Sequence, residues 1–132
     1  MTLTAYPNGV QADVVGNVTG GVQLPVQVAS TDGAITIKSG IVVITKGSAA
    51  AITLAAPVAG AQSAGGDDGK KLEIYSTTAF AHTVTFSNGL AGAGASADVA
   101  TFGTAAANRF SVFAYNGAWF LSGGAAVNVT FA

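Results

Sequence analysis

The chain has 132 residues, of which 50% are hydrophobic and only 8% are charged, and it contains one histidine and no cysteine. An ordinary soluble domain carries about 25% charged residues. This composition offers few nucleophiles, acids or bases, so we expect neither an enzyme nor a bound cofactor. Without cysteine the chain has no disulfide scaffold and no thiolate metal site. The net charge of −1 predicts no nucleic-acid partner.

The hydrophobicity does not come from a membrane segment. No run of about 18 or more apolar residues is present, and the longest apolar stretches, such as Ile41-Val42-Val43-Ile44, have the length of a strand. We therefore expect no membrane partner. A chain this apolar and this poor in charge is expected to bury surface against copies of itself or within a larger assembly.

Residues 1–32 contain turn signals but no sustained alternation of apolar and polar residues. Pro7-Asn8-Gly9, Gly20-Gly21 and Asp32-Gly33 divide them into short extended pieces. We interpret this segment as an extended arm that lies on another subunit or on a larger surface. A terminus without fixed structure and two irregular edge strands are the alternatives. The residues expected to make the arm's contacts are Tyr6, Pro7, Val10, Val14 and Val15.

Residues 33–132 are predicted to form an all-β domain. Apolar residues recur with the period of two that is typical of strands, between turn residues. About eight strands are expected, in an antiparallel β-sandwich or a compact barrel. The segment from Leu90 to Asp98 is mostly alanine and glycine and is predicted to be a surface loop. The main predicted strands are residues 34–38, 41–45, 51–55, 72–76, 82–86, 109–115, 118–121 and 127–131.

The strongest local signal is Asn116-Gly117 between two apolar runs, which predicts a two-residue β-hairpin turn because both residues must adopt positive φ. This turn would pair Tyr115 with Ala118 and Phe113 with Phe120. Both faces of the hairpin are then apolar, so it should lie inside a sandwich or meet a neighbouring subunit. A carbohydrate-binding platform is the alternative for its rings. The aromatic residues assigned to the core or to a subunit interface are Phe110, Phe113, Tyr115, Trp119 and Phe120.

Two polar groups are candidates for chemistry. His82 could act as a general base, but no nucleophile motif accompanies it, and a structural role is favoured. Asp67-Asp68-Gly69 could begin a calcium loop, but it lacks the alternating oxygen ligands of such loops and is followed by two lysines. We interpret it as a turn and expect no metal site.

Several blocks in their order resemble short structural proteins of tailed-bacteriophage virions. The resemblance implies a capsid decoration (cement) protein on the outer surface of the head, forming a homo-oligomer of three copies that binds the major capsid protein. Similar blocks also occur in tail appendages, so a tail-fibre or spike module that binds host-surface glycans is the alternative. A hydrolase is the third and least favoured hypothesis. The blocks are residues 6–10, 51–57, 67–69, 81–85 and 114–119.

Overall fold

The computed structural model describes residues 23–91, 98–122 and 127–132. These residues form eleven strands and one short 3₁₀ helix, η1 (Gln62–Ala64). The strands are β1 (Val26–Ala29), β2 (Gly33–Ile35), β3 (Gly40–Ile44), β4 (Ala51–Leu54), β5 (Lys71–Ser76), β6 (Thr83–Phe86), β7 (Leu90–Ala91), β8 (Val99–Phe102), β9 (Arg109–Tyr115), β10 (Ala118–Leu121) and β11 (Val129–Phe131).

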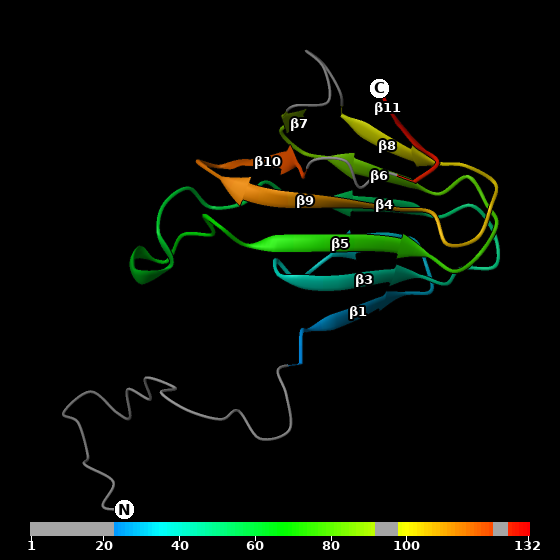
Figure 1. Cartoon of the computed structure of the whole chain (residues 1–132), viewed down its shortest axis with the longest axis horizontal. Coiled ribbons are helices and arrows are strands. Elements are labelled where there is room, and N and C mark those ends of the chain that lie inside the picture. The colour runs from blue at the N-terminus through cyan, green and yellow to red at the C-terminus, as the bar shows by residue number, and fades with distance from the viewer. Residues whose placement is uncertain (1–22, 92–97, 123–126) are drawn as a thin grey trace, which may run out of the picture.

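The strands form two sheets that pack face to face. The six-stranded sheet has the order β1-β3-β5-β9-β10-β7, and the five-stranded sheet has the order β11-β8-β6-β4-β2. In Figure 1 the six-stranded sheet lies in front, with β1 at the bottom and β9 and β10 above it. The expected all-β, sandwich-like fold is confirmed.

From β1 to β6 the chain alternates between the two sheets. Each strand therefore pairs in parallel with the strand two places later in the chain: β1 with β3 and β3 with β5 in one sheet, β2 with β4 and β4 with β6 in the other. The segment winds as a flattened coil, in which apolar residues at matching positions of successive turns lie side by side. Ile35, Leu54 and Phe86, for example, lie side by side on β2, β4 and β6.

Antiparallel strands follow this coil. In the six-stranded sheet β9 pairs antiparallel with β5 and with β10, and in the five-stranded sheet β8 pairs antiparallel with β6 and with β11. The β9–β10 hairpin has the expected register, Tyr115 with Ala118 and Phe113 with Phe120. Asn116 and Gly117 adopt φ values of 48° and 78°, so the turn prediction is confirmed.

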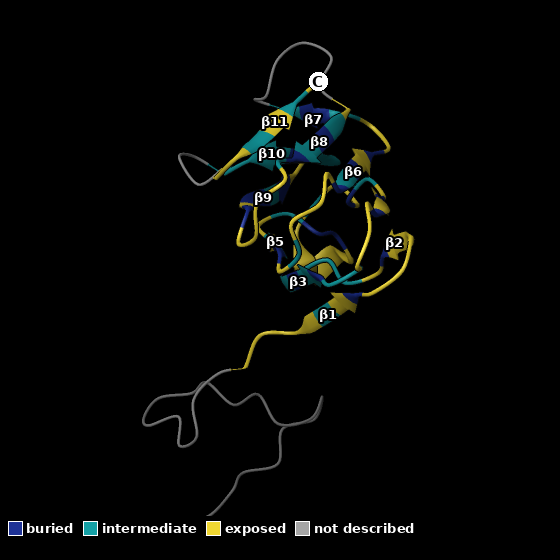
Figure 2. Ribbon diagram, turned by 90° about the vertical axis from the view of Figure 1, so that its right-hand side faces the viewer, coloured by how far each residue is buried: buried dark blue, intermediate teal, exposed yellow. Residues whose placement is uncertain are grey.

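The hydrophobic core lies between the sheets and consists of the inward-facing residues of both. Figure 2 shows exposed residues on much of β1 and β2, at one edge of the sandwich, and buried residues along the strands between the edges. The largest fully buried side chains include Trp119, Phe102 and Phe110. Phe110 lies at the centre of a ring cluster, with ring centroids 5.7 Å from Phe102, 6.1 Å from Phe86 and 5.6 Å from Phe131. These contacts join strands of both sheets.

Four expectations about the strands need correction. The sheets are mixed rather than antiparallel, because successive strands of the first half lie in different sheets. Residues 26–29, which were assigned to the arm, form β1 and pair with β3 along their whole length. Leu90 and Ala91, which were assigned to a loop, form β7 beside β10. Val99–Phe102, which was not among the predicted strands, forms β8.

The start of β3 needs a glycine, which gives a testable prediction. Gly40 has φ +117°, and a Cβ there would collide with the backbone carbonyl of Pro25. That carbonyl accepts the hydrogen bond of the Ile41 N–H at 2.9 Å, so it cannot move away freely. We expect Gly40→Ala to lower the free energy of unfolding by about 1–3 kcal/mol, measured by denaturant unfolding.

The matched control is Gly47→Ala, because a Cβ at Gly47 would meet nothing within 4 Å. Its effect should stay within about 0.5 kcal/mol. Equal stability of the two variants would contradict the proposed role of Gly40.

Candidate functional site

The outer faces of the two sheets differ in chemistry. Strand residues alternate between the core and the outside, and on the six-stranded sheet most of the outward side chains are apolar. Exposure is high on the edge strand β1 and at the end of β9: Val26 is 58%, Val28 59% and Tyr115 58% exposed. We call this surface the apolar outer face and define it by Val26, Val28, Ile41, Val43, Tyr75, Phe113, Tyr115 and Phe120.

The outer face of the five-stranded sheet is polar and uncharged. Threonine residues lie next to each other across its strands: Thr53 beside Thr85, and Thr83 beside Thr101, which in turn lies beside Thr130. None of its five strands contains a charged residue. Threonine exposes a methyl group and a hydroxyl that water can satisfy. This face suits contact with solvent, whereas the apolar outer face does not.

The structure divides the five predicted aromatic residues between the core and the outside. Phe110 and Trp119 are buried, with 0% and 1% exposure. Phe113, Tyr115 and Phe120 point outward, where the rings of Phe113 and Phe120 stack at 5.4 Å and Tyr115 lies 6.2 Å from Phe120. The outward rings therefore form one cluster at the hairpin, as the register predicts.

Charged side chains lie within the apolar outer face as well. Lys71 and Glu73 are two residues apart on β5 and both are exposed. Lys71 lies opposite Phe113, and Glu73 lies between Ile41 and Ser111. Among the described residues neither makes an ion pair. Sequence reasoning missed both residues, although the alternation of Lys71-Leu72-Glu73-Ile74 would have placed their side chains together on one face.

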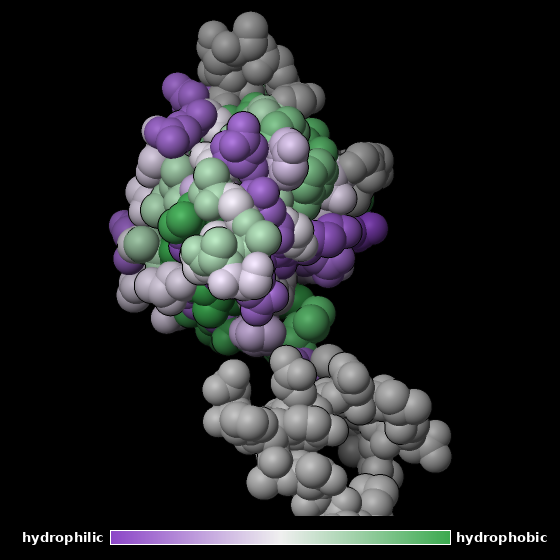
Figure 3. Space-filling view, turned by 90° about the vertical axis from the view of Figure 1, so that its left-hand side faces the viewer, coloured by the Kyte–Doolittle hydropathy of each residue, from purple (hydrophilic) through white to green (hydrophobic). Residues whose placement is uncertain are grey.

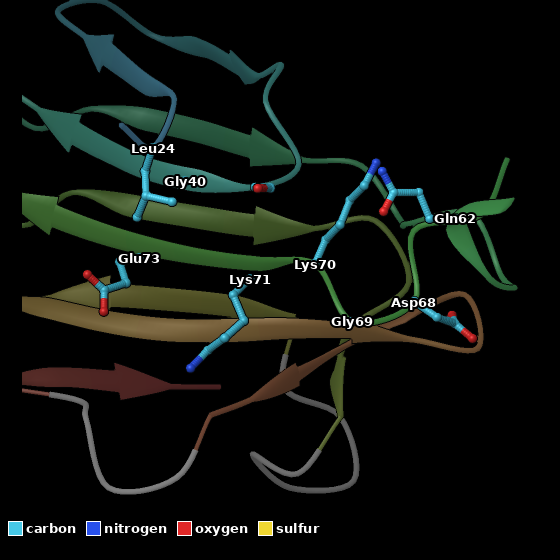
Figure 4. A pocket seen from close by; sticks show the side chains of 9 residues that line it. Leu24, Gly40, Gln62, Asp68, Gly69, Lys70, Lys71 and Glu73 are labelled. Carbon is cyan, nitrogen blue, oxygen red and sulfur yellow. The ribbon is translucent and has the colours of Figure 1, made fainter. Parts of the chain in front are cut away.

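A cleft of about 500 Å³ lies at the beginning of β5, where the lining residue Lys71 is paired with Phe113 of β9. Lys70 and Gln62 extend toward one another above it, and Lys71 and Glu73 extend from β5 (Figure 4). At this end of the sandwich hydrophobic and hydrophilic residues are interspersed (Figure 3). The remaining lining residues are Leu24, Ser39, Gly40, Asp68 and Gly69.

The loop beside this cleft is held by a buried carboxylate. Asp67 is 5% exposed, and it pairs with Lys70 at 2.7 Å and with Lys38 at 3.0 Å. It also accepts the backbone N–H of Val58 at 2.8 Å. The hydrogen bond from Lys70, together with those from Val58 and Lys38, holds the pKa of Asp67 far below its usual range. This carboxylate is therefore used to fix the loop, which fits the interpretation of Asp67-Asp68-Gly69 as a turn.

His82 is fully buried. Its Nδ1 accepts the backbone N–H of Ala50 at 3.0 Å, so the ring proton sits on Nε2, which lies 2.8 Å from the Thr78 hydroxyl. That hydroxyl donates in turn to the Lys46 carbonyl at 2.8 Å. Both ring nitrogens therefore bridge segments of the fold, and this geometry agrees with the structural role favoured from the sequence.

His82 should make the stability of the protein depend on pH. Burial, supported by the nearby Lys46 charge, lowers the pKa of His82 in the folded protein. Below about pH 6.5, His82 therefore binds a proton in the unfolded chain but remains neutral in the folded protein until the pH is lower still. We expect the free energy of unfolding to decrease as the pH falls below about 6.5, measured by urea unfolding at a series of pH values. His82→Gln should lose this pH step, and an unchanged step in that variant would exclude His82 as its source.

Other features of the described residues can be stated briefly. They contain no group of three or more His, Cys, Asp or Glu side chains placed to hold a metal ion. In the same residues, no helix has the length and apolar character needed to cross a membrane. The predicted arm contacts Tyr6, Pro7, Val10, Val14 and Val15 lie outside the described residues.

The chain was also compared with models of protein families, with curated proteins and with solved structures, and no match was found. The function must therefore be argued from the surfaces described above.

Proposed function

We propose that this chain is a capsid decoration protein of a tailed bacteriophage, bound as a homo-oligomer to the outer surface of the head. The observation that carries the proposal is the apolar outer face. Val26, Val28 and Tyr115 of this face are each between 58% and 59% exposed, and large exposed apolar surface marks an interface. The order of sequence blocks that resemble phage virion proteins supports the choice of assembly.

The proposed mechanism is stabilisation of the shell by mass action. A protein that binds only the assembled shell lowers the free energy of that shell relative to its dissociated parts. The apolar outer face is buried against neighbouring copies, three in the proposed assembly. The arm contacts the major capsid protein through Tyr6, Pro7, Val10, Val14 and Val15. The uncharged threonine face of the other sheet faces solvent.

The test of this proposal is the number of copies in purified virions that carry the protein. Quantitative mass spectrometry should find a copy number comparable with that of the major capsid protein. Particles stripped of the protein should release their genome at a lower temperature, and adding the protein back should restore the original value. A few copies per particle, or unchanged thermal stability after stripping, would contradict a decoration role.

A second candidate function is supported by the outward rings. Tyr115 and Phe120 lie close together at the hairpin, and the neighbouring Phe113 is paired with Lys71, which lines a cleft together with amide and carboxylate groups. Sugars bind by stacking on rings and hydrogen bonding to such groups. This arrangement favours the alternative of a tail-fibre or spike module that binds host glycans. Screening the protein against a panel of glycans tests it. Binding that Tyr115→Ala abolishes would support this function, and the absence of binding would remove it.

A further inference from the structure

The apolar outer face has an organised charge pattern that indicates its partner. The aliphatic residues of β1 and β3 lie at one side, and the outward rings of β9 and β10 lie at the other. Lys71 and Glu73 lie between them on β5, with opposite charges and about 7 Å apart along the strand. The face therefore carries one positive and one negative charge at its centre, and the exposed Arg109 lies on the same face at the start of β9, opposite Tyr75.

Most other charges of the described residues already have partners. Lys38 and Lys70 pair with Asp67, and Lys46 pairs with Asp32. Arg109 lies over the ring of Tyr75, with its guanidinium carbon 5.9 Å from the ring centroid. Covering the apolar outer face would remove water from Lys71 and Glu73, and a buried charge without a partner is costly. A partner that supplies an anion at Lys71 and a cation at Glu73 would offset this cost.

A second copy of this chain supplies both. We propose that copies associate through the apolar outer face so that Lys71 of each copy pairs with Glu73 of the next. This inference rests on the proposed function and names the surface by which the copies meet. The same contact places aliphatic and aromatic side chains of one copy against those of its neighbour and leaves neither charge unpaired.

The charge pattern also selects the orientation of the copies. Residues related by a rotation axis lie at the same height along that axis. If the strands ran along the axis, Lys71 would meet Lys71 and Glu73 would meet Glu73, and both contacts would be repulsive. If β5 crosses the axis, Lys71 and Glu73 lie at similar heights, and rotation brings each beside the opposite charge of the neighbour. The strands therefore cross the symmetry axis, whether two or three copies assemble.

The test is a charge exchange in the full chain. Analytical ultracentrifugation should find a dimer or trimer for the natural protein. Lys71→Glu alone and Glu73→Lys alone should each weaken association by at least about tenfold, because each places like charges together. The double variant K71E/E73K should restore association to within about threefold, since the exchanged pair has the same geometry.

Controls separate charge from folding. Thr85→Lys adds a charge to the opposite, threonine face and should leave association unchanged. Glu73→Gln removes the charge with little change in shape and should weaken association less than Glu73→Lys does. Thermal unfolding checks that each variant is folded.

A monomer at all concentrations, or a double variant that associates no better than the single variants, would overturn the inference. A monomer that still covers virions at capsid-like copy number would leave the decoration role standing without the homo-oligomer, whereas an oligomer absent from virions would overturn only the decoration role.

Discussion

Replacing Trp119 with alanine should destabilise the protein by about 3–5 kcal/mol. The side chain is 1% exposed and is among the largest fully buried groups of the core. Its indole N–H donates to the Ala55 carbonyl at 2.9 Å, which joins β10 to the chain after β4. The substitution removes the ring, leaves a cavity and deprives that carbonyl of its partner. Urea or thermal unfolding monitored by circular dichroism gives the measurement.

Tyr115→Ala is the matched control, because it removes an aromatic side chain from the same hairpin. Tyr115 is 58% exposed, so its loss should change the stability of the isolated chain by no more than about 0.5 kcal/mol. If Trp119→Ala were as mild as Tyr115→Ala, the assignment of Trp119 to the core would be wrong. A loss of self-association in Tyr115→Ala with stability preserved would agree with the proposed interface.

Replacing Asp67 with alanine should lower the free energy of unfolding by about 2–3 kcal/mol. The carboxylate is buried, and its loss leaves the Val58 N–H without its acceptor and two lysines without their counter-ion. Both lysine side chains are 33% exposed, so they can turn toward water, which keeps the expected loss below that of a fully buried ion pair. Chemical unfolding at pH 7 measures the effect.

The pH dependence of the free energy of unfolding gives a second test of the role of Asp67. The pKa of Asp67 is lowered in the folded protein, so its contribution to stability is present above the unfolded value of about 4 and is lost as the pH falls below it. Asp67→Ala should flatten the stability curve in this acid range. Asp98→Asn, at an exposed carboxylate without an ion pair among the described residues, is the control, and an equal flattening of the curve in that variant would contradict the assignment to Asp67.

The local elements could be predicted well because their signals are local. Asn116-Gly117 predicts the turn through backbone sterics alone, and the turn length then dictates the pairing of Phe113 with Phe120. The same register separates Trp119 on the inner face from Phe120 on the outer face. The sequence could not decide which of the two apolar faces is covered, because residues on both faces are apolar.

The pairing of distant strands could not be predicted in the same way. The alternation of apolar residues shows that Ile41–Ile44 and Ala51–Leu54 are strands. The same alternation is expected whether a strand pairs with the strand before it or lies in the other sheet. β1 was missed for a related reason. The sequence of residues 26–29 does not distinguish an edge strand from an extended arm, because only the pairing with β3, later in the chain, makes this segment a strand.

The apolar outer face could be predicted only in part from the sequence, for the same reason. From the composition alone we expected that the chain buries surface in an assembly. The sequence did not show that Lys71 and Glu73 lie between the aliphatic residues of β3 and the rings of β9, since those neighbours are about 30 to 40 residues away in the chain.

The amino-acid sequence by itself determined the all-β class, the hairpin with its register, and the scarcity of charge that points to assembly. These follow from backbone preferences and side-chain periodicity, which act over a few residues. Only the tertiary structure decided the parallel coil, the separation of an apolar face from a threonine face, and the position of Lys71 and Glu73 at the centre of the apolar outer face. These depend on which distant strands pair, and that is settled by burying all the inward side chains in one core.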